Sequence, residues 1–123
     1  MASSSRTTLK KTPSTKLSRS MFGEIQLCRF PFTSGAGFKI RPALVLFDLG
    51  QDAIIARVTS VRRNGALDVT VRDWQAANLL MPSVVRLDRL VTAEKVIFIR
   101  RLGTLSSHDL EAVRTRWNQA MRL

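Results

Sequence analysis

Apolar residues recur along the chain in short runs that fit β-strands, and a helical pattern is clearest at the C-terminal end. The most apolar run, 43–47, has a β-branched centre and predicts a strand that is buried on both faces. Further strands are expected over 22–32, 53–60, 67–72, 83–91 and 95–101. Because turn residues separate these runs at short intervals, the fold class that the pattern favours is mainly β with α, as a small antiparallel barrel closed by a C-terminal helix.

The C-terminal segment predicts an amphipathic helix. Ser106 is an N-cap candidate, and Asp109 follows where a capping box places its acidic residue. We expect the apolar face of this helix to pack against the barrel and to bury its tryptophan. That face is formed by Leu110, Val113, Trp117 and Met121.

Two shorter segments predict the connections between strands. Asn64-Gly65 is typical of a tight hairpin and would join the strand over 53–60 to the strand over 67–72. Asp73 precedes several good helix formers, so 73–78 is expected to form one helical turn.

The charge of the chain points to an anionic partner. Twenty basic and nine acidic side chains give a net charge of +11 at pH 7. Residues 1–20 carry five of the basic side chains and no acidic one, and they hold too few large apolar groups to fold, so we interpret them as a disordered basic tail before a domain over 21–123. Such an excess attracts nucleic acid or an acidic protein, although the same cations could serve only solubility. The apolar runs are too short to span a membrane and no secretory signal is visible, so we expect a cytoplasmic protein.

Few residues of the chain can carry chemistry. The single histidine, His108, is expected in the first turn of the helix, and the single cysteine, Cys28, in a strand, which argues against a histidine-based triad and against a zinc site. The sequence contains no phosphate-binding loop and no dinucleotide fingerprint, so we expect no cofactor and no metal. The candidates that remain lie at strand ends: Arg41, Thr59, Ser60, Arg86 and Asp88.

Arg41 is the most suggestive of these candidates. Pro42 holds the preceding residue in an extended conformation, so Arg41 is a cation at the mouth of a rigid strand, where it suits a phosphate or a carboxylate. It could equally be a surface arginine that begins a strand. Together with a threonine and an aspartate, arginines can support RNA cleavage without a metal, because they stabilise the charge that develops when a 2′-OH attacks the neighbouring phosphate.

Several motifs occur in the order and at the separations of a known family. Over roughly residues 22–122 the chain resembles the PemK/MazF toxins of type II toxin–antitoxin modules. The motifs that carry the resemblance are Gly23-Glu24-Ile25, Arg41-Pro42-Ala43-Leu44-Val45-Leu46, Val58-Thr59-Ser60, Pro82-Ser83-Val84-Val85-Arg86-Leu87-Asp88 and Arg101-Leu102-Gly103-Thr104-Leu105-Ser106.

The resemblance implies an SH3-like barrel, a homodimer and a metal-independent endoribonuclease that cleaves single-stranded RNA at short sequences and so inhibits translation and growth. It also implies neutralisation by an acidic, partly disordered antitoxin, and binding of operator DNA as a toxin–antitoxin complex. Residue by residue, Arg41 matches the arginine that contacts the scissile phosphate, Thr59 the threonine paired with it, and Arg86 and Asp88 an acid–base pair. RNA-binding side chains are expected at Lys39, Ser60, Arg62 and Arg63.

The chain departs from the family pattern in one loop. The loop that should carry a Glu or a His reads Gly35-Ala36-Gly37-Phe38-Lys39, with neither. This departure favours an alternative, a catalytically silent barrel that binds nucleic acid or an antitoxin by charge. A second alternative is a gyrase-poisoning toxin on the same fold, like CcdB. That activity uses a Trp-Gly-Ile-like C-terminus, whereas this chain ends in Met121-Arg122-Leu123.

Overall fold

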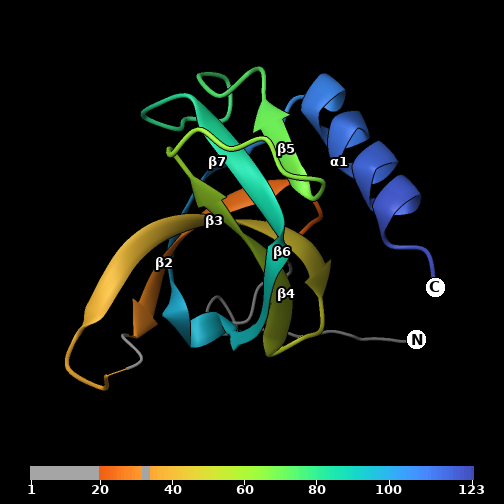
Figure 1. The fold of residues 1–123 in the computed structure, drawn as a ribbon. Helices are drawn as coiled ribbons and strands as arrows, with labels where there is room; N and C mark the ends of the chain where they lie inside the picture. The colour runs from red at the N-terminus through yellow and green to blue at the C-terminus, as the bar shows by residue number, and fades with distance from the viewer. Residues whose placement is uncertain (1–19, 32–33) are drawn as a thin grey trace, which may run out of the picture.

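The computed structural model describes residues 20–31 and 34–123, so the predicted tail, apart from Ser20, lies outside the described residues. Ser20 itself is buried, and its backbone N–H donates to Asp48 Oδ2 at 2.6 Å. Six strands, a 3₁₀ turn and one helix follow (Figure 1), at β2 Glu24–Pro31, β3 Phe38–Asp48, β4 Asp52–Thr59, β5 Asp68–Val71, β6 Ser83–Glu94, η3 Lys95–Ile97, β7 Phe98–Thr104 and α1 Ser107–Ala120.

The strands form one antiparallel sheet in the order β5-β6-β4-β3-β2-β7. The sheet is strongly curved, so its strands wrap around a common interior, and α1 lies beside β5 (Figure 1). The predicted fold class, mainly β with a C-terminal helix, is confirmed. No helix within the described residues is long and apolar enough to cross a membrane.

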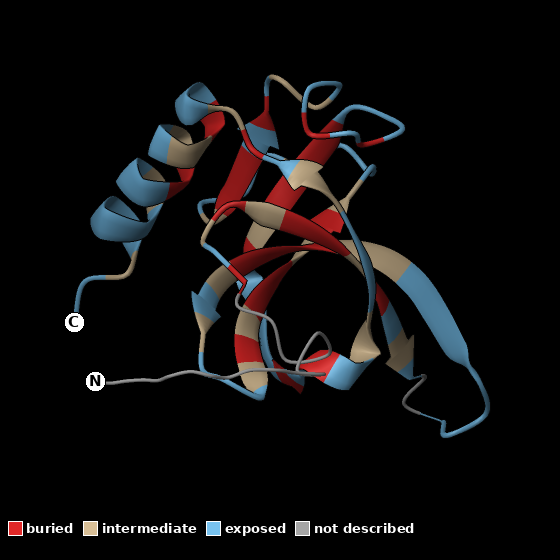
Figure 2. Cartoon of the chain, turned by 180° about the vertical axis from the view of Figure 1, so that it is seen from behind, coloured by how far each residue is buried: buried red, intermediate tan, exposed pale blue. Residues whose placement is uncertain are grey.

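The sheet has two separate apolar clusters, one on each face. Figure 2 shows the buried stretches of the strands that supply them. Side chains alternate along β3, so Leu44 joins the cluster beneath α1 while Ala43 and Val45 join the opposite one. All three residues are fully buried, which confirms the prediction for 43–45, but the end of the predicted run is not covered, because Leu46 is half-buried and Phe47 is exposed. The opposite cluster, completed by Cys28, Ala53, Ile55 and Ala93, forms the apolar floor next to the candidate site described below.

The N-terminus of α1 is held by its predicted cap and by contacts that the sequence did not reveal. The Ser106 hydroxyl accepts the Asp109 N–H at 3.2 Å, which confirms the N-cap. The Asp109 carboxylate, buried to 1% exposure, accepts the backbone N–H groups of Arg72 at 2.9 Å and of Asp73 at 2.8 Å. Asp109 therefore fastens the helix to the end of β5.

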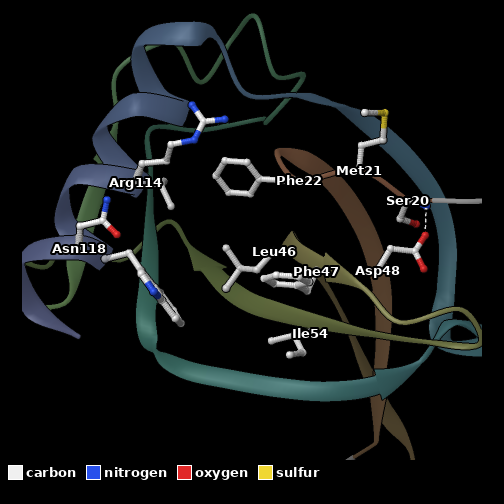
Figure 3. A pocket seen from close by; sticks show the side chains of 11 residues that line it. Ser20, Met21, Phe22, Leu46, Phe47, Asp48, Ile54, Arg114 and Asn118 are labelled. Carbon is white, nitrogen blue, oxygen red and sulfur yellow. Dashed lines mark hydrogen bonds between the residues drawn. The ribbon is translucent and has the colours of Figure 1, made fainter. Parts of the chain in front are cut away.

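The prediction that Trp117 is buried is wrong. The residue is 36% exposed, because it lies over an open pocket, whereas Leu110 and Val113 of the same helix and Met121 at its C-terminal end pack against the core. This pocket, with a volume of about 740 Å³, is lined by α1 together with residues of β3 and β4 and by the segment before β2 (Figure 3). Phe47 and Met21, which also line it, are 65% and 69% exposed.

The hairpin predicted at Asn64-Gly65 is also wrong, because β6 lies between β4 and β5 in the sheet. The segment between those strands is organised by Asp68, whose carboxylate accepts the Gly65 N–H at 2.7 Å and lies 3.4 Å from Arg63 Nε. The Asp68 N–H also donates to the Gly65 carbonyl oxygen at 3.2 Å, so Asp68 closes this turn with both its side chain and its backbone.

The strand expected over 95–101 begins three residues later, at β7. Lys95–Ile97 forms a 3₁₀ turn instead, in which the nearly buried Lys95 Nζ lies 2.9 Å from Asp48 Oδ1. Burying a lysine requires such a partner, and this ion pair fixes the corner between β6 and β7. Further along β7, Gly103 allows close packing on the predicted turn over 73–78, since a Cβ there would lie 2.7 Å from the Ala77 carbonyl oxygen.

Candidate active site

The candidate site lies where β6 leaves its regular pairing with β4. Arg57 pairs with Arg86, but the preceding residue on β4, Ala56, pairs with Leu90, so residues 87–89 of β6 form a bulge. Bulges bend a strand and redirect side chains, and they recur beside active sites. Asp88 occupies the centre of this one, two residues from Arg86.

Three arginines from three adjacent strands share one face of the sheet at this point. On β4, Arg57 stands opposite Ala43 of β3 on one side and opposite Arg86 of β6 on the other. Arg41 precedes Ala43 by two residues and therefore projects from the same face. This is the face of the fully buried Ala43, so the three guanidinium groups stand at the edge of an apolar floor.

Arg41, Arg57 and Arg86 form a row across the three strands, and the electrostatics of this row are those of an anion site. Burial lowers the pKa of Arg57, and the positive charges of Arg41, Arg86 and Arg89 lower it further. Two carboxylates lie beside the row: that of Asp88, 3.2 Å from Arg86 Nη2, and that of Asp68, which stands opposite Arg86 on β5 and pairs with Arg63. Because these two carboxylates are paired with Arg86 and Arg63, positive charge remains on this face, and an anionic ligand placed there would relieve the repulsion.

Arg86 and Asp88 form a direct ion pair, in which Arg86 Nη2 donates to Asp88 Oδ2. Burial would raise the pKa of Asp88, but the hydrogen bond and the charge of Arg86 outweigh it and leave the pKa below its ordinary value. Asp88 is therefore a carboxylate at neutral pH, able to accept a proton. The Arg86 side chain is 14% exposed, and its buried Nε atom has no hydrogen-bond partner among the described residues.

Thr59 lies at the end of β4, on the same strand as Arg57. Its Oγ1 accepts the Val61 N–H at 3.1 Å, which leaves the hydroxyl hydrogen free to be donated. Regular β3–β4 pairing ends at Ala43 and Arg57. Continuing that register by two residues would set Thr59 opposite Arg41, on the face of the arginine row.

The four residues expected to bind RNA fall into two groups. Lys39 is exposed near the start of β3, and Ser60 and Arg62 are exposed directly after β4. Arg63 also follows β4, but it is half-buried and its guanidinium is paired with Asp68. Lys39 therefore lies on the strand of Arg41, two residues before it, and Ser60 and Arg62 are exposed just after the strand of Arg57, while Arg63 helps to shape the loop.

Arg57 is the residue that the sequence interpretation missed. The alternation of β4 does contain the signal, since Ala53, Ile55, Arg57 and Thr59 are two residues apart and so share a face. Without the sheet order, however, the sequence does not show that β4 lies between the strands of Arg41 and Arg86.

Other nucleophiles and metal ligands do not gather at the site. Burial raises the pKa of the Cys28 thiol to about 12, so this cysteine is a protonated core residue. His108 is exposed in the first turn of α1. Within the part of the chain that the structure describes, no three His, Cys, Asp or Glu side chains form a group that could hold a metal ion.

Comparison with known proteins agrees with this architecture. The family profile described as "PemK-like, MazF-like toxin of type II toxin-antitoxin system" matches residues 21–121. No curated protein sequence matches the chain.

Three solved structures illustrate the similarity of fold. An endoribonuclease from mycobacterial species has a TM-score of 0.66 and 17% identity over 85% of this chain and 93% of its own. The Mycobacterium tuberculosis toxin MazF-mt6 has a TM-score of 0.65 and 23% identity over 80% and 95% of the two chains. A MazE–MazF structure from Deinococcus radiodurans has a TM-score of 0.65 and 20% identity over 80% and 92%.

Proposed function

The chain belongs to the PemK-like, MazF-like toxins of type II toxin–antitoxin systems, and from this premise we propose that it is a metal-independent endoribonuclease. Its substrate is single-stranded RNA, cut at short sequences, and the result is inhibition of translation and growth. The observation that carries the proposal is the row of arginines on one sheet face, with Asp88 paired to Arg86 at its edge.

In the proposed reaction the 2′-OH of the RNA attacks the adjacent phosphorus. Arg41 and Arg86 flank the phosphate and stabilise the charge that grows on its oxygens, and the Thr59 hydroxyl donates to a non-bridging oxygen. The O2′–P bond forms and the P–O5′ bond breaks, which leaves a 2′,3′-cyclic phosphate and a 5′-OH.

Asp88 and Arg86 carry the protons in this scheme. Asp88 accepts the 2′-OH proton, for which its lowered pKa keeps it ionised, and Arg86 protonates the leaving O5′. Their hydrogen bond of 3.2 Å then gives the proton a direct route from Asp88 back to Arg86. The pair is thus reset without a third ionisable group, which offers a reason why the loop over 35–39 can lack both Glu and His.

The proposed partners follow from the charge and from the family. Among similar structures, the mycobacterial endoribonuclease occurs in complex with its cognate antitoxin, and the Deinococcus radiodurans MazF with MazE. We expect an acidic antitoxin segment to cover Arg41 and Arg86 in the cytoplasm, with binding that weakens as salt screens the charges. The toxin–antitoxin complex is the form expected to bind operator DNA.

A homodimer is the expected assembly. The apolar pocket beside α1 exposes Phe47 and Trp117, and covering such side chains with a second copy would remove them from water. The basic row lies on the opposite side of β3 from Leu46, which lines this pocket, so a dimer formed there leaves the row open to RNA.

The proposal is tested by incubating purified protein with single-stranded RNA in EDTA. Wild-type protein should cleave, and Asp88→Asn should lower the rate by about 10²–10⁴ because the general base is lost. Wild-type protein that is folded and binds RNA but leaves it intact would support the silent binding barrel instead. Cleavage that is abolished by EDTA and restored by Mg²⁺ would refute the metal-free route.

A further inference from the structure

Arg57 is placed to bind the substrate, although neither the family motifs nor the sequence analysis gave it a role. It is the middle member of the row, because β4 lies between β3 and β6 in the sheet. Two strand spacings of about 4.8 Å and the two-residue offset of Arg41 along β3 put about 12 Å between the backbones of Arg41 and Arg86, and Arg57 lies between them.

The surroundings of Arg57 are unfavourable for a residue with only a structural role. The carboxylates beside the row are engaged elsewhere, since Asp88 pairs with Arg86 and the carboxylate of Asp68 with Arg63. Among the described residues, no hydrogen bond or ion pair joins Arg57 to an acidic side chain. A partly buried cation that has no carboxylate partner and is surrounded by like charges lowers the stability of the fold. A role in binding an anion explains why an arginine occupies this position.

We propose that Arg57 is the central phosphate-binding residue of the site and contacts a phosphodiester of single-stranded RNA from below, between Arg41 and Arg86. This inference rests on the proposed function for the identity of the RNA, but phosphate binding itself is independent of cleavage. The guanidinium can donate two parallel hydrogen bonds to phosphate oxygens, which an ammonium group cannot reproduce. The row is therefore a three-point anion cradle rather than a pair of flanking arginines.

Two consequences separate this role from a structural one. Because Arg57→Gln removes a partly buried charge that is repelled by its neighbours, the free variant should unfold at the same temperature as wild type or a few degrees higher. Inorganic phosphate should raise the unfolding temperature of wild type more than that of the variant, because an anion bound to the folded chain stabilises it by mass action. A structural arginine would give a lower unfolding temperature and an unchanged response to phosphate.

The decisive experiment measures binding of a 2′-O-methyl oligonucleotide, which cannot react, alongside cleavage of the matching RNA. Arg57→Gln should bind the analogue about 10- to 100-fold more weakly, as expected for loss of one or two hydrogen bonds to a charged group. Arg57→Lys should recover part of the affinity but not the full cleavage rate. Arg122→Gln, which removes the same charge beyond the end of α1, is the matched control and should match wild type apart from a small loss of affinity that salt abolishes.

The outcomes keep the two proposals apart. Weaker binding by Arg57→Gln in a wild type that does not cleave RNA would support the cradle and refute the ribonuclease. Wild-type affinity and wild-type cleavage in Arg57→Gln would overturn the cradle and leave the ribonuclease standing. An unfolding temperature of Arg57→Gln more than about 5 °C below that of wild type, a shift of about 1 kcal/mol in a domain of this size, would assign Arg57 a structural role.

Discussion

Replacing Asp109 with alanine should destabilise the fold more than any other single change at the helix terminus. The carboxylate is buried and accepts two backbone N–H groups, from Arg72 and Asp73, and lies 3.3 Å from the Ser106 hydroxyl. Alanine would leave both N–H groups without their acceptor. A fully buried donor left unpaired costs about 1–3 kcal/mol, and because these two hydrogen bonds are only part-buried, the loss should be at most roughly 6 kcal/mol. Since a domain of this kind has a total stability of about 5–15 kcal/mol, the variant should be marginally folded.

The measurement is urea unfolding followed by tryptophan fluorescence, with Ser106→Ala as the matched control. Ser106→Ala removes the N-cap and should cost about 1 kcal/mol, because caps contribute that much on average. Asp109→Asn keeps one carbonyl oxygen and should fall between the two variants. If Asp109→Ala lost no more stability than Ser106→Ala, at an unchanged dependence on urea, the two backbone hydrogen bonds would not be what fastens α1 to β5.

Three further outcomes are expected. Arg41→Ala should lower the cleavage rate by about 10²–10³, and Arg41→Lys should restore it only in part, as single-turnover kinetics with the unfolding temperature as control would show. Asp48 has a pKa of about 2, below its ordinary value of 3.8, because it accepts hydrogen bonds from Lys95, Gly50 and Ser20. Its stabilising effect is complete above about pH 4 and is lost as the pH falls towards 2, so the difference in unfolding free energy between wild type and Asp48→Asn should become smaller over that range. A difference that stays constant with pH would contradict the ion pair. Light scattering at micromolar concentration should give twice the chain mass of 13.8 kDa, and Phe47→Ser combined with Trp117→Ser should give the monomer, whereas a monomeric wild type would count against the dimer.

Much of the fold could be predicted because strand content depends on local patterns. The run over 43–47 is apolar on both faces, and the structure buries Ala43, Leu44 and Val45 completely. The Ser106 cap was readable for the same reason, since a cap and its N–H donor lie three residues apart in the chain. Such features need no knowledge of what packs against them.

The failures all involve partners that are distant in sequence. Asn64-Gly65 suggested a hairpin, but whether β4 and β5 pair is decided by β6, which inserts between them. Trp117 follows the apolar period of α1, yet it lies over an open pocket rather than over the core. Periodicity assigns a residue to a face but does not say what covers that face.

The candidate site shows the same limit. Arg86 and Asp88 are two residues apart, and their pairing was anticipated from the motif that contains them. Arg57 could be recognised only when β3 and β6 were seen on either side of β4, because its significance lies in two neighbours that are far away in the chain. The roles of all these residues in catalysis stay predictions until the variants are measured.

The central claim, cleavage through the 2′-OH at the arginine row, is tested most directly by the ends of the RNA products. A single-stranded RNA with one cleavage site is incubated with the protein in EDTA, in parallel with the same RNA carrying a single 2′-deoxy sugar at that site. The account predicts a 2′,3′-cyclic phosphate and a 5′-OH from the first RNA, and intact but bound substrate from the second. Equal cleavage of both RNAs, or products that end in a 5′-phosphate, would contradict it.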